Sequence, residues 1–555
     1  MRTYTKKSLS LFSFVLIFGA ILVMVNILGL GLWGRLDLTE DKVYSLSDGT
    51  RAMLKSMDDQ VEIRAYFSRD LPSHLGSLVQ YVKDQLDDYK AYSGGKVSYR
   101  FLDPAESKDI EDEANGRGCP PLTLQQMSSD QYATQKVYMC LTFFFEDKKE
   151  VIPAVRSTEG LEYEITSILK KVTARSVRQV GILQGHGEPN LQAPEPNPMQ
   201  PQEPEAGLSG LNEALGRNYK VVPVDTTSDA GLAKLEELDT LLVIAPTTEI
   251  KEQEQFAIDQ FIMKGKTVAF FLDRVSTDLR MFTAAPRTTG LEGMLTSYGV
   301  TLNDDLVMDK FNQPIAVSQQ AGNIRYQTRM PYPFFVLAGN FNDQIGLNPE
   351  QNMVLKLEKL ILPFVSTLTL SQSTDARKVD WLVRSSQYSW KQLSGRYTIN
   401  PMQIENPAQT DVTGPYNLAA VVTGSFDSFF SAKADSPEPY MGGKEVIKKS
   451  SDTRIFVMAN GALPQDRFMD PGNMQFIENL VDWLVQDESL ISIRSRGFRP
   501  EPLDPEMSAG HKALIKYGNI VGVPALFLLL GVVLTQLRAA RKRRLAATFF
   551  TKSAK

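Results

Sequence analysis

Two apolar runs without a charged residue lie near the two ends of the chain. Residues 9–32 read LSLFSFVLIFGAILVMVNILGLGL, and residues 517–537 read YGNIVGVPALFLLLGVVLTQL. A helix needs about 20 apolar residues to cross a bilayer, so each run predicts a transmembrane helix. The first run is longer than the apolar part of a signal peptide, and no A-x-A-like cleavage site follows it. An uncleaved anchor is therefore favoured over a cleaved signal peptide.

The charges outside these runs predict how the chain crosses the membrane. The basic residues on the outer flanks are Arg2, Lys6, Lys7, Arg538, Arg541, Lys542, Arg543 and Arg544. Lys and Arg are enriched on the cytoplasmic side of spans, so both termini are predicted to be cytoplasmic and the region between the spans to be exported. This predicts a two-pass protein of the bacterial inner (cytoplasmic) membrane with a large periplasmic region. Beside a span, the basic tail is interpreted as a topology signal and a lipid-headgroup contact rather than as a nucleic-acid patch.

Between the spans, the first part of the exported region has strand and helix patterns in a recognisable order. Strands are predicted at 61–68 and 96–102, a hairpin at 135–145 and 150–155, and helices at 48–57, 75–92 and 158–172. Ser47 is the candidate N-cap of the first of these helices. From residue 61 onward, the order strand, helix, strand, hairpin, helix is that of a thioredoxin-like sandwich. Because it lacks a CxxC motif, we expect a structural or binding module.

From residue 177 onward, strands and helices alternate, which predicts a doubly wound, mainly parallel sheet with helices on both faces. The expected strands lie at 178–183, 219–224, 240–245, 267–272 and 454–459, and the expected helices at 208–216, 252–264 and 473–485. A long excursion before the last strand has no clean periodicity and is predicted to be an inserted subdomain of mixed strands.

The predicted fold class is therefore α/β, with two transmembrane helices flanking a thioredoxin-like domain and a doubly wound domain. The expected boundaries are a cytoplasmic N-terminus at 1–8, a span at 9–32, the thioredoxin-like domain at 37–175, the doubly wound domain at 176–310 and 414–495 with its insertion at 311–413, a juxtamembrane linker at 496–516, a span at 517–537 and a basic cytoplasmic tail at 538–555.

Net charge agrees with this division and excludes one class of partner. The whole chain carries −5, the residues before the first span carry +3 and those from Arg538 onward carry +7, so the region between them carries −15. A region this acidic has no electrostatic footprint for nucleic acid. Cys119 and Cys140 both lie in this region and form a candidate disulfide.

The stretch GILQGHGEPN holds the most reactive-looking residues of the chain. Gly185, His186, Gly187 and Glu188 fall at the carboxyl end of the first strand of the predicted doubly wound sheet, where such folds place ligands. Glycines there let a backbone approach a ligand, and a histidine can move a proton or bind a metal. Two interpretations stay open: a ligand pocket, or a strand-to-loop turn whose histidine is hydrogen-bonded locally. A metal site needs three or four ligands, and the sequence near His186 has no Asp, His or Cys cluster with ligand spacing, so no metal is expected.

Catalytic signatures are weaker than this positional signal. The turns after the third and fourth predicted strands read VIAPTTEI and FFLDRVST, without the glycines that surround a nucleophile in G-x-S-x-G. Asp273 ends the fourth strand and either lines the same crevice as His186 or caps a helix. No G-x-x-x-x-G-K-[ST] loop occurs, so ATP binding by that loop is not expected. No other cofactor is expected either. The proline-rich residues 191–207 predict an exposed loop that is either a lid over His186 or a solvated excursion.

Several of these segments together resemble a known family. RLDLTEDKVYSLSDGTRAML after the first span, VEIRAYFSRDLP, GILQGHGEPN, VTLNDDLVMD, YPFFV and SLISIRSR are similar to the GldG-type auxiliary proteins of ABC transporters, which are associated with bacterial gliding motility. The resemblance implies a membrane-anchored extracytoplasmic subunit that works with a separate ABC permease and a cytoplasmic ABC ATPase. It also implies a central domain similar to class I glutamine amidotransferases without their nucleophile.

These observations predict a non-enzymatic transporter subunit whose residues 185–188 contribute to a pocket for a glycan, another ligand or an envelope protein. One alternative is an amidotransferase-like or hydrolase-like periplasmic enzyme that uses His186 and Glu188, in which a nucleophile or metal converges on His186. The other alternative is an envelope scaffold with no transport role.

Overall fold

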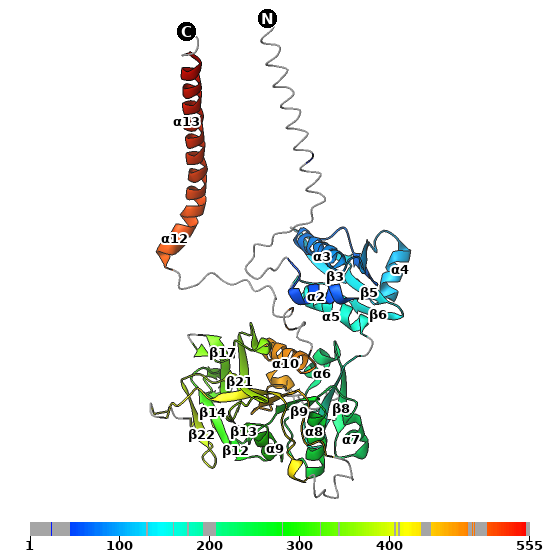
Figure 1. The fold of residues 1–555 in the computed structure, drawn as a ribbon, viewed down its shortest axis with the longest axis vertical. Helices are drawn as coiled ribbons and strands as arrows, with labels where there is room; N and C mark the ends of the chain where they lie inside the picture. Colours follow the sequence, from blue (N-terminus) through cyan, green and yellow to red (C-terminus); the bar gives the residue numbers. More distant parts are fainter. Residues whose placement is uncertain are drawn as a thin grey trace. The chain divides into compact units, whose positions relative to one another are not determined.

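A computed structural model shows a mixed α/β chain (Figure 1). It describes residues 45–550 and Met24, except for residues 129–130, 159, 175–176, 193–206, 280, 322–323, 342–343, 405–406, 409–410, 434–445, 487–490, 492 and 494–507. The span expected at 9–32 therefore lies outside the described residues, apart from Met24. The chain divides into two compact units, Met1–Gly497 and Phe498–Lys555.

The N-terminal domain is built on a four-stranded sheet with the order β2-β1-β5-β6. β1 (Val61–Phe67) pairs in parallel with β2 (Val97–Leu102) and antiparallel with β5 (Met139–Phe145), which continues to β6 (Lys148–Ile152). The other elements are α2 (Asp48–Ser56), α3 (Ser73–Tyr92), α4 (Lys108–Gly116), the hairpin of β3 (Leu122–Ser128) and β4 (Gln131–Val137), and α5 (Leu161–Thr173). The predicted order of strand, helix, strand, hairpin and helix is confirmed, with α4 and the hairpin β3–β4 as additions.

The spacing of apolar residues on the helices explains how they pack against the sheet of this domain. Val82 and Leu86 of α3, together with Ile165 and Leu169 of α5, are fully buried in one core with the inward side chains of β1 and β5. Ser47 caps α2 as predicted, because its Oγ accepts a hydrogen bond from Thr50 N at 3.1 Å.

The central domain contains a nine-stranded sheet whose main path has the order β13-β20-β23-β24-β10-β9-β7-β8. Five of these strands are mutually parallel and match the predicted ones: β7 (Gln179–Gln184), β8 (Lys220–Asp225), β9 (Thr240–Ile244), β10 (Thr267–Phe271) and β24 (Thr453–Met458). The connecting helices are α6 (Ser209–Gly216), α7 (Asp229–Leu235), α8 (Glu252–Met263), α9 (Glu292–Ser297) and α10 (Pro471–Leu484).

Helices cover both faces of this sheet, because its strands are apolar on both sides. Ile182 and Phe271 belong to the core that contains α6 and α10, whereas their neighbours Leu183 and Phe270 belong to the core that contains α7, α8 and α9. Figure 1 shows α6 and α10 on one side of the sheet and α7 and α8 on the other. Near-continuous apolar strands are typical of a sheet buried on both faces.

The sheet differs from the mainly parallel prediction, because it is mixed. β23 (Asn417–Gly424) pairs antiparallel with β24, and β20 (Leu368–Leu370) and β21 (Arg377–Arg384) pair antiparallel with β23. β13 (Val300–Leu302) joins β20. β20 and β21 come from the region expected to be an insertion, so part of that region completes the main sheet. An antiparallel neighbour needs no helical crossover, which is why the alternation of strands and helices gave no sign of these strands.

The rest of the excursion forms small antiparallel sheets. They are β11 (Val275–Asp278) with β12 (Thr283–Pro286), β14 (Asp305–Asp309) with β22 (Ser389–Leu393), β15 (Ile315–Ala321) with β16 (Ile324–Met330), and β17 (Phe335–Phe341) between β18 (Gln344–Ile345) and β19 (Lys359–Pro363). Aromatic side chains such as Tyr332, Phe334 and Phe364 pack with one another in a satellite core there.

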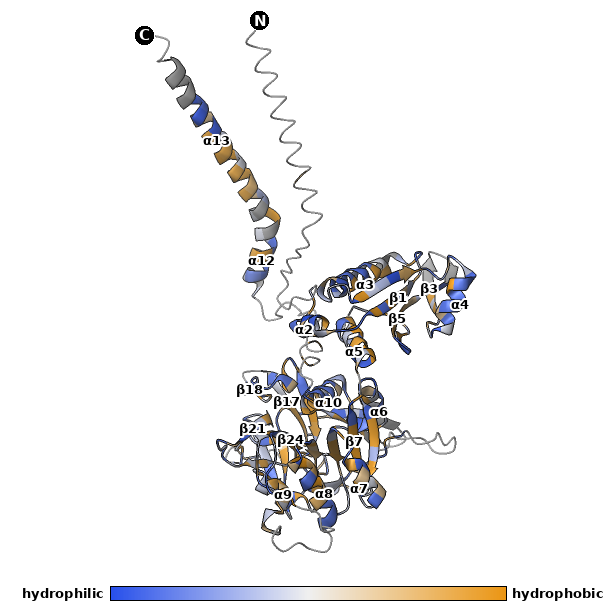
Figure 2. Cartoon of the chain, turned by 45° about the vertical axis from the view of Figure 1, so that its right-hand side comes forward, coloured by the Kyte–Doolittle hydropathy of each residue, from blue (hydrophilic) through white to orange (hydrophobic). Residues whose placement is uncertain are grey.

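The C-terminal unit is helical. α12 (Ala509–Tyr517) continues through a π-helical turn (Gly518–Gly522) into α13 (Val523–Phe550). Within the described part of the chain, one helical stretch, Gly510–Arg543, is long and apolar enough to cross a membrane, and it contains the span predicted at 517–537. Figure 2 shows the hydrophobic run of α13 giving way to hydrophilic residues toward its end.

Candidate functional site

The loop that contains His186 lies at a special point of the sheet. Among the five parallel strands, β7 is first in the chain and lies between β8 and β9, so the strand order reverses there. In doubly wound folds, ligands bind outside the carboxyl ends of the strands at this switch point. The loops that follow β7 and β9 therefore occupy the position where the sequence analysis expected a site.

The two glycines of the GHGE stretch let neighbouring loops approach closely. Gly185 and Gly187 have φ values of 111° and 77°, which favour glycine. A Cβ atom on Gly187 would overlap Thr247 Oγ1, and a Cβ atom on Gly185 would lie 2.6 Å from Asp225 Oδ1. The small size of both residues is thus needed for packing against the loops after β9 and β8.

The backbone of His186 fastens the β7 loop to the β9 loop. Its carbonyl oxygen accepts hydrogen bonds from Thr247 N at 2.8 Å, Thr248 N at 3.0 Å and Thr247 Oγ1 at 3.1 Å. Its own N–H donates to Glu188 Oε2 at 2.7 Å. The first three bonds join the two loops, and the fourth fixes the conformation of the β7 loop itself.

The imidazole of His186 lies between two buried carboxylates. Nε2 is 3.0 Å from Glu254 Oε2, and Nδ1 is 3.4 Å from Glu188 Oε1. All three residues are buried, and Glu254 Oε2 also accepts a hydrogen bond from Lys251 N at 2.8 Å. The Glu188 carboxylate raises the pKa of His186 most strongly; burial opposes this and Glu254 adds to it. The protonated imidazolium is therefore the form that this environment favours.

This geometry decides what the predicted residues can contact. The side chains of His186 and Glu188 are turned inward: the imidazole lies against Glu188 and Glu254, and Glu188 accepts a hydrogen bond from His186 N. Gly185, Gly187, Thr247 and Thr248 are exposed at the carboxyl edge. Among the described residues, the side chains that hold the imidazole are the two glutamates, and no group of three or more His, Cys, Asp or Glu residues could hold a metal ion.

Asp273 lies at the carboxyl end of β10 and has different neighbours. Its Oδ1 accepts a hydrogen bond from Gly461 N at 2.6 Å, and its Oδ2 is 4.0 Å from Arg287 Nη1. Burial raises the pKa of this carboxyl, against the attraction of Arg287 and Arg467. The helix-cap interpretation is wrong, because the hairpin β11–β12 follows Asp273 instead of a helix. Asp273 ties β10 to the segment after β24.

Ala245, which directly follows β9, was not singled out by the sequence analysis. It is buried and has a positive φ of 49°, an unusual conformation for a residue with a side chain. A strained residue between a strand and a helix is where hydrolases of this architecture display their nucleophile. Here a methyl group takes that place.

Asp466 occupies another position where α/β proteins bind ligands, the N-terminus of the first helix after the first strand. Its carboxylate accepts hydrogen bonds from Ser209 N at 2.9 Å, Ser209 Oγ at 2.7 Å and Gly210 N at 2.8 Å. Such N–H groups bind phosphate in nucleotide-binding folds. Because the carboxylate of Asp466 fills this position, the N–H groups of Ser209 and Gly210 are not available to a nucleotide phosphate.

The two ends of the proline-rich stretch lie next to each other in the central domain. Asn190 and Gly207 form a parallel bridge, and Leu208 N donates to Asn190 O at 2.7 Å. Residues 193–206 lie outside the described residues, so the choice between a lid and a solvated excursion stays a prediction.

The two cysteines lie together in the N-terminal domain. Cys119 and Cys140 form a disulfide with a Cα–Cα distance of 5.7 Å, and both are fully buried beside Tyr66 and Ala114. Disulfides persist in oxidising compartments and are rare in the cytosol.

Comparison with known proteins gives three findings. A family profile described as an ABC-type uncharacterized transport system matches residues 177–486, and a domain of unknown function matches residues 40–143. A protein of Borreliella burgdorferi described as uncharacterized is 23% identical over 523 residues, which cover 92% of this chain and 94% of that protein. Among solved structures, the mmIFT52 N-terminal domain is 12% identical, covers 55% of this chain and 96% of its own, and superposes with a TM-score of 0.32, too low to bear on the fold.

Proposed function

This chain belongs to the ABC-type uncharacterized transport system family, and on that premise we propose that it is the non-enzymatic, membrane-anchored extracytoplasmic subunit of such a system. The observation that carries the proposal is the family match over residues 177–486, more than half of the chain. The family implies association with the components of an ABC transport system, which we propose to be a permease and a cytoplasmic ATPase. The GldG-type resemblance extends the proposal to a role in gliding motility.

Two features support a location outside the cytoplasm. The buried Cys119–Cys140 disulfide suits an oxidising compartment. The helical stretch Gly510–Arg543 contains the uncharged run 517–537, and basic residues follow this run from Arg538 onward, which supports a cytoplasmic C-terminus if the run spans the membrane. With the span at 9–32, the proposed topology has both termini in the cytoplasm.

Two features support the absence of catalysis. A methyl group stands at Ala245, where an amidotransferase-like or hydrolase-like fold presents its nucleophile. The imidazole of His186 is already held by Glu188 and Glu254. On this proposal, the thioredoxin-like domain and the amidotransferase-like domain that the resemblance implies are binding modules.

The carboxyl edge of the central sheet is the surface that we propose for a ligand or partner loop. Its exposed part consists of Gly185, Gly187, Thr227, Thr247 and Thr248, and the carboxylate of Asp225 lies beside Gly185. Hydroxyl groups, backbone and a carboxylate suit a hydroxyl-rich glycan or a polar peptide. His186 contributes by keeping this edge rigid rather than by contacting the ligand.

Replacement of Thr248 by arginine is expected to weaken association with the partner at this edge. The Thr248 side chain is exposed, and its backbone bond to His186 O does not depend on the side chain, so the variant should fold as the wild type does. A bulky cation that costs about 1.4 kcal/mol of interface energy weakens binding about tenfold. The measurement is the amount of transport component recovered with the tagged protein from membranes.

Glu213→Arg is the control, because Glu213 is exposed on α6 and the change also introduces an arginine, with a change in net charge of +2 against +1 for Thr248→Arg. Equal recovery with the wild type and Thr248→Arg would remove this edge as the binding surface for the transport component. Equal loss in both variants would point to net charge instead.

A further inference from the structure

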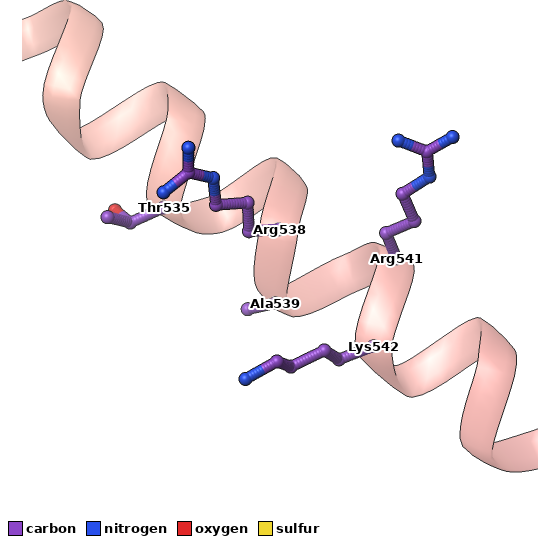
Figure 3. A pocket seen from close by; sticks show the side chains of 5 residues that line it. All are labelled: Thr535, Arg538, Ala539, Arg541 and Lys542. Atoms are coloured by element: carbon purple, nitrogen blue, oxygen red, sulfur yellow. The ribbon is translucent and has the colours of Figure 1, made fainter. Parts of the chain in front are cut away.

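The helix that continues out of the apolar stretch carries a basic notch. Thr535, Arg538, Ala539, Arg541 and Lys542 line it. In Figure 3, Arg538 and Lys542 flank the small side chain of Ala539, whereas Arg541 extends from the other side of the helix. Residues 538 and 542 are one helical turn apart, so their side chains lie on the same face.

Two cations at this spacing on a helix repel each other. No aspartate or glutamate occurs from residue 508 to the end of the chain, so this segment itself supplies no counter-charge. Within residues 508–555, therefore, no acidic side chain offsets the repulsion between Arg538 and Lys542. Arginine presents a fork that matches two phosphate oxygens, and lysine adds a point charge.

The position of the notch along the helix selects the kind of anion. The exposed apolar side chains run to Leu537, and Arg538 is the first charged residue after them. If the apolar stretch crosses the bilayer, the notch lies at the depth of the headgroup phosphates. We propose that Arg538 and Lys542 bind the phosphodiester of one anionic phospholipid of the cytoplasmic leaflet, over Ala539. This inference rests on the proposed membrane anchoring and adds a specific lipid site to it.

The test uses the full-length protein in nanodiscs of phosphatidylcholine with a minority of phosphatidylglycerol. Native mass spectrometry counts the phosphatidylglycerol molecules that stay bound. Arg538→Gln/Lys542→Gln should lower this retention about tenfold, because it removes both charge-assisted contacts to the phosphodiester. Arg544→Gln/Lys552→Gln removes the same charge from two basic residues of the tail that are not among those lining the notch, and should retain the lipid as the wild type does.

Equal losses in the two double variants would show diffuse attraction and overturn the site, as would no loss in either. Failure of the wild type to enter nanodiscs would overturn the membrane anchoring together with the site. Unchanged lipid retention in Arg538→Gln/Lys542→Gln, combined with a lower recovery of an ATPase from membranes, would assign the notch to an acidic protein surface and overturn the lipid proposal.

Discussion

Replacement of His186 by alanine is expected to destabilise the central domain by about 4 kcal/mol. The imidazole separates the carboxylates of Glu188 and Glu254, which are both buried. Removing one member of a buried charged group typically costs about 3–5 kcal/mol, because the remaining carboxylates are left without an oppositely charged partner. If His186 instead served only to contact a ligand, its loss would leave folding intact.

Urea denaturation of the wild type and the variant measures this difference. His511→Ala is the matched control, because His511 is exposed on α12 and its loss should change the free energy of unfolding by less than about 0.5 kcal/mol. A loss below about 1 kcal/mol in His186→Ala would contradict the structural role of the imidazole.

The same contact gives the wild type a pH dependence of defined sign. The folded-state pKa of His186 is raised above the ordinary value of about 6.5. A group with a raised folded-state pKa stabilises the fold fully below its unfolded pKa and loses this contribution as the pH rises through the folded value. The urea midpoint should therefore fall as the pH is raised from about 6 through the raised pKa. This imidazole contribution should be absent from His186→Ala.

Gly187→Ala is expected to cost about 3 kcal/mol. A residue with a side chain at φ 77° costs about 1–2 kcal/mol, and the added Cβ overlaps Thr247 Oγ1, so the two loops must move apart. Gly216→Ala is the control, because nothing lies within 4 Å of its added Cβ, and it should change stability by less than about 1 kcal/mol.

A double-mutant cycle with Thr247→Ala tests the cause of the Gly187 effect. Thr247→Ala removes the overlapping hydroxyl and its bond to His186 O. If overlap contributes to the cost, the double variant loses less stability than the two single variants together. Strict additivity would show that the backbone conformation alone accounts for the loss.

The repeating part of the fold could be predicted from the sequence. Four of the five parallel strands are largely buried apolar runs bounded by polar turns, the exception being the partly exposed edge strand β8, and all five lie within two residues of their expected positions. β23 was missed because its sequence, NLAAVVTG, stands outside the alternation of strands and helices and pairs antiparallel. Its neighbours β20 and β21 are paired through contacts far apart in the chain, which no local pattern reveals.

The candidate site could also be predicted only in part, because some of its contacts join residues far apart in the chain. The GHGE stretch was located from its position after the first strand, but its partner Glu254 lies 68 residues away. One signal was present: a glutamate in the first turn of the helix after the third strand points back to the helix N-terminus, and so to the same edge. The positive φ of Ala245 has no sequence signal, because alanine does not favour that conformation.

Identification of the proteins that accompany this chain in its native membrane tests the central claim most directly. The tagged, full-length protein is solubilised in mild detergent, and its stoichiometric partners are identified by mass spectrometry. The predicted result is the recovery of an ABC ATPase together with a multi-span permease. The control variant His511→Ala should recover the same two partners. Recovery of the folded chain alone, or with envelope proteins but neither transport component, would contradict the proposed role and favour an envelope scaffold.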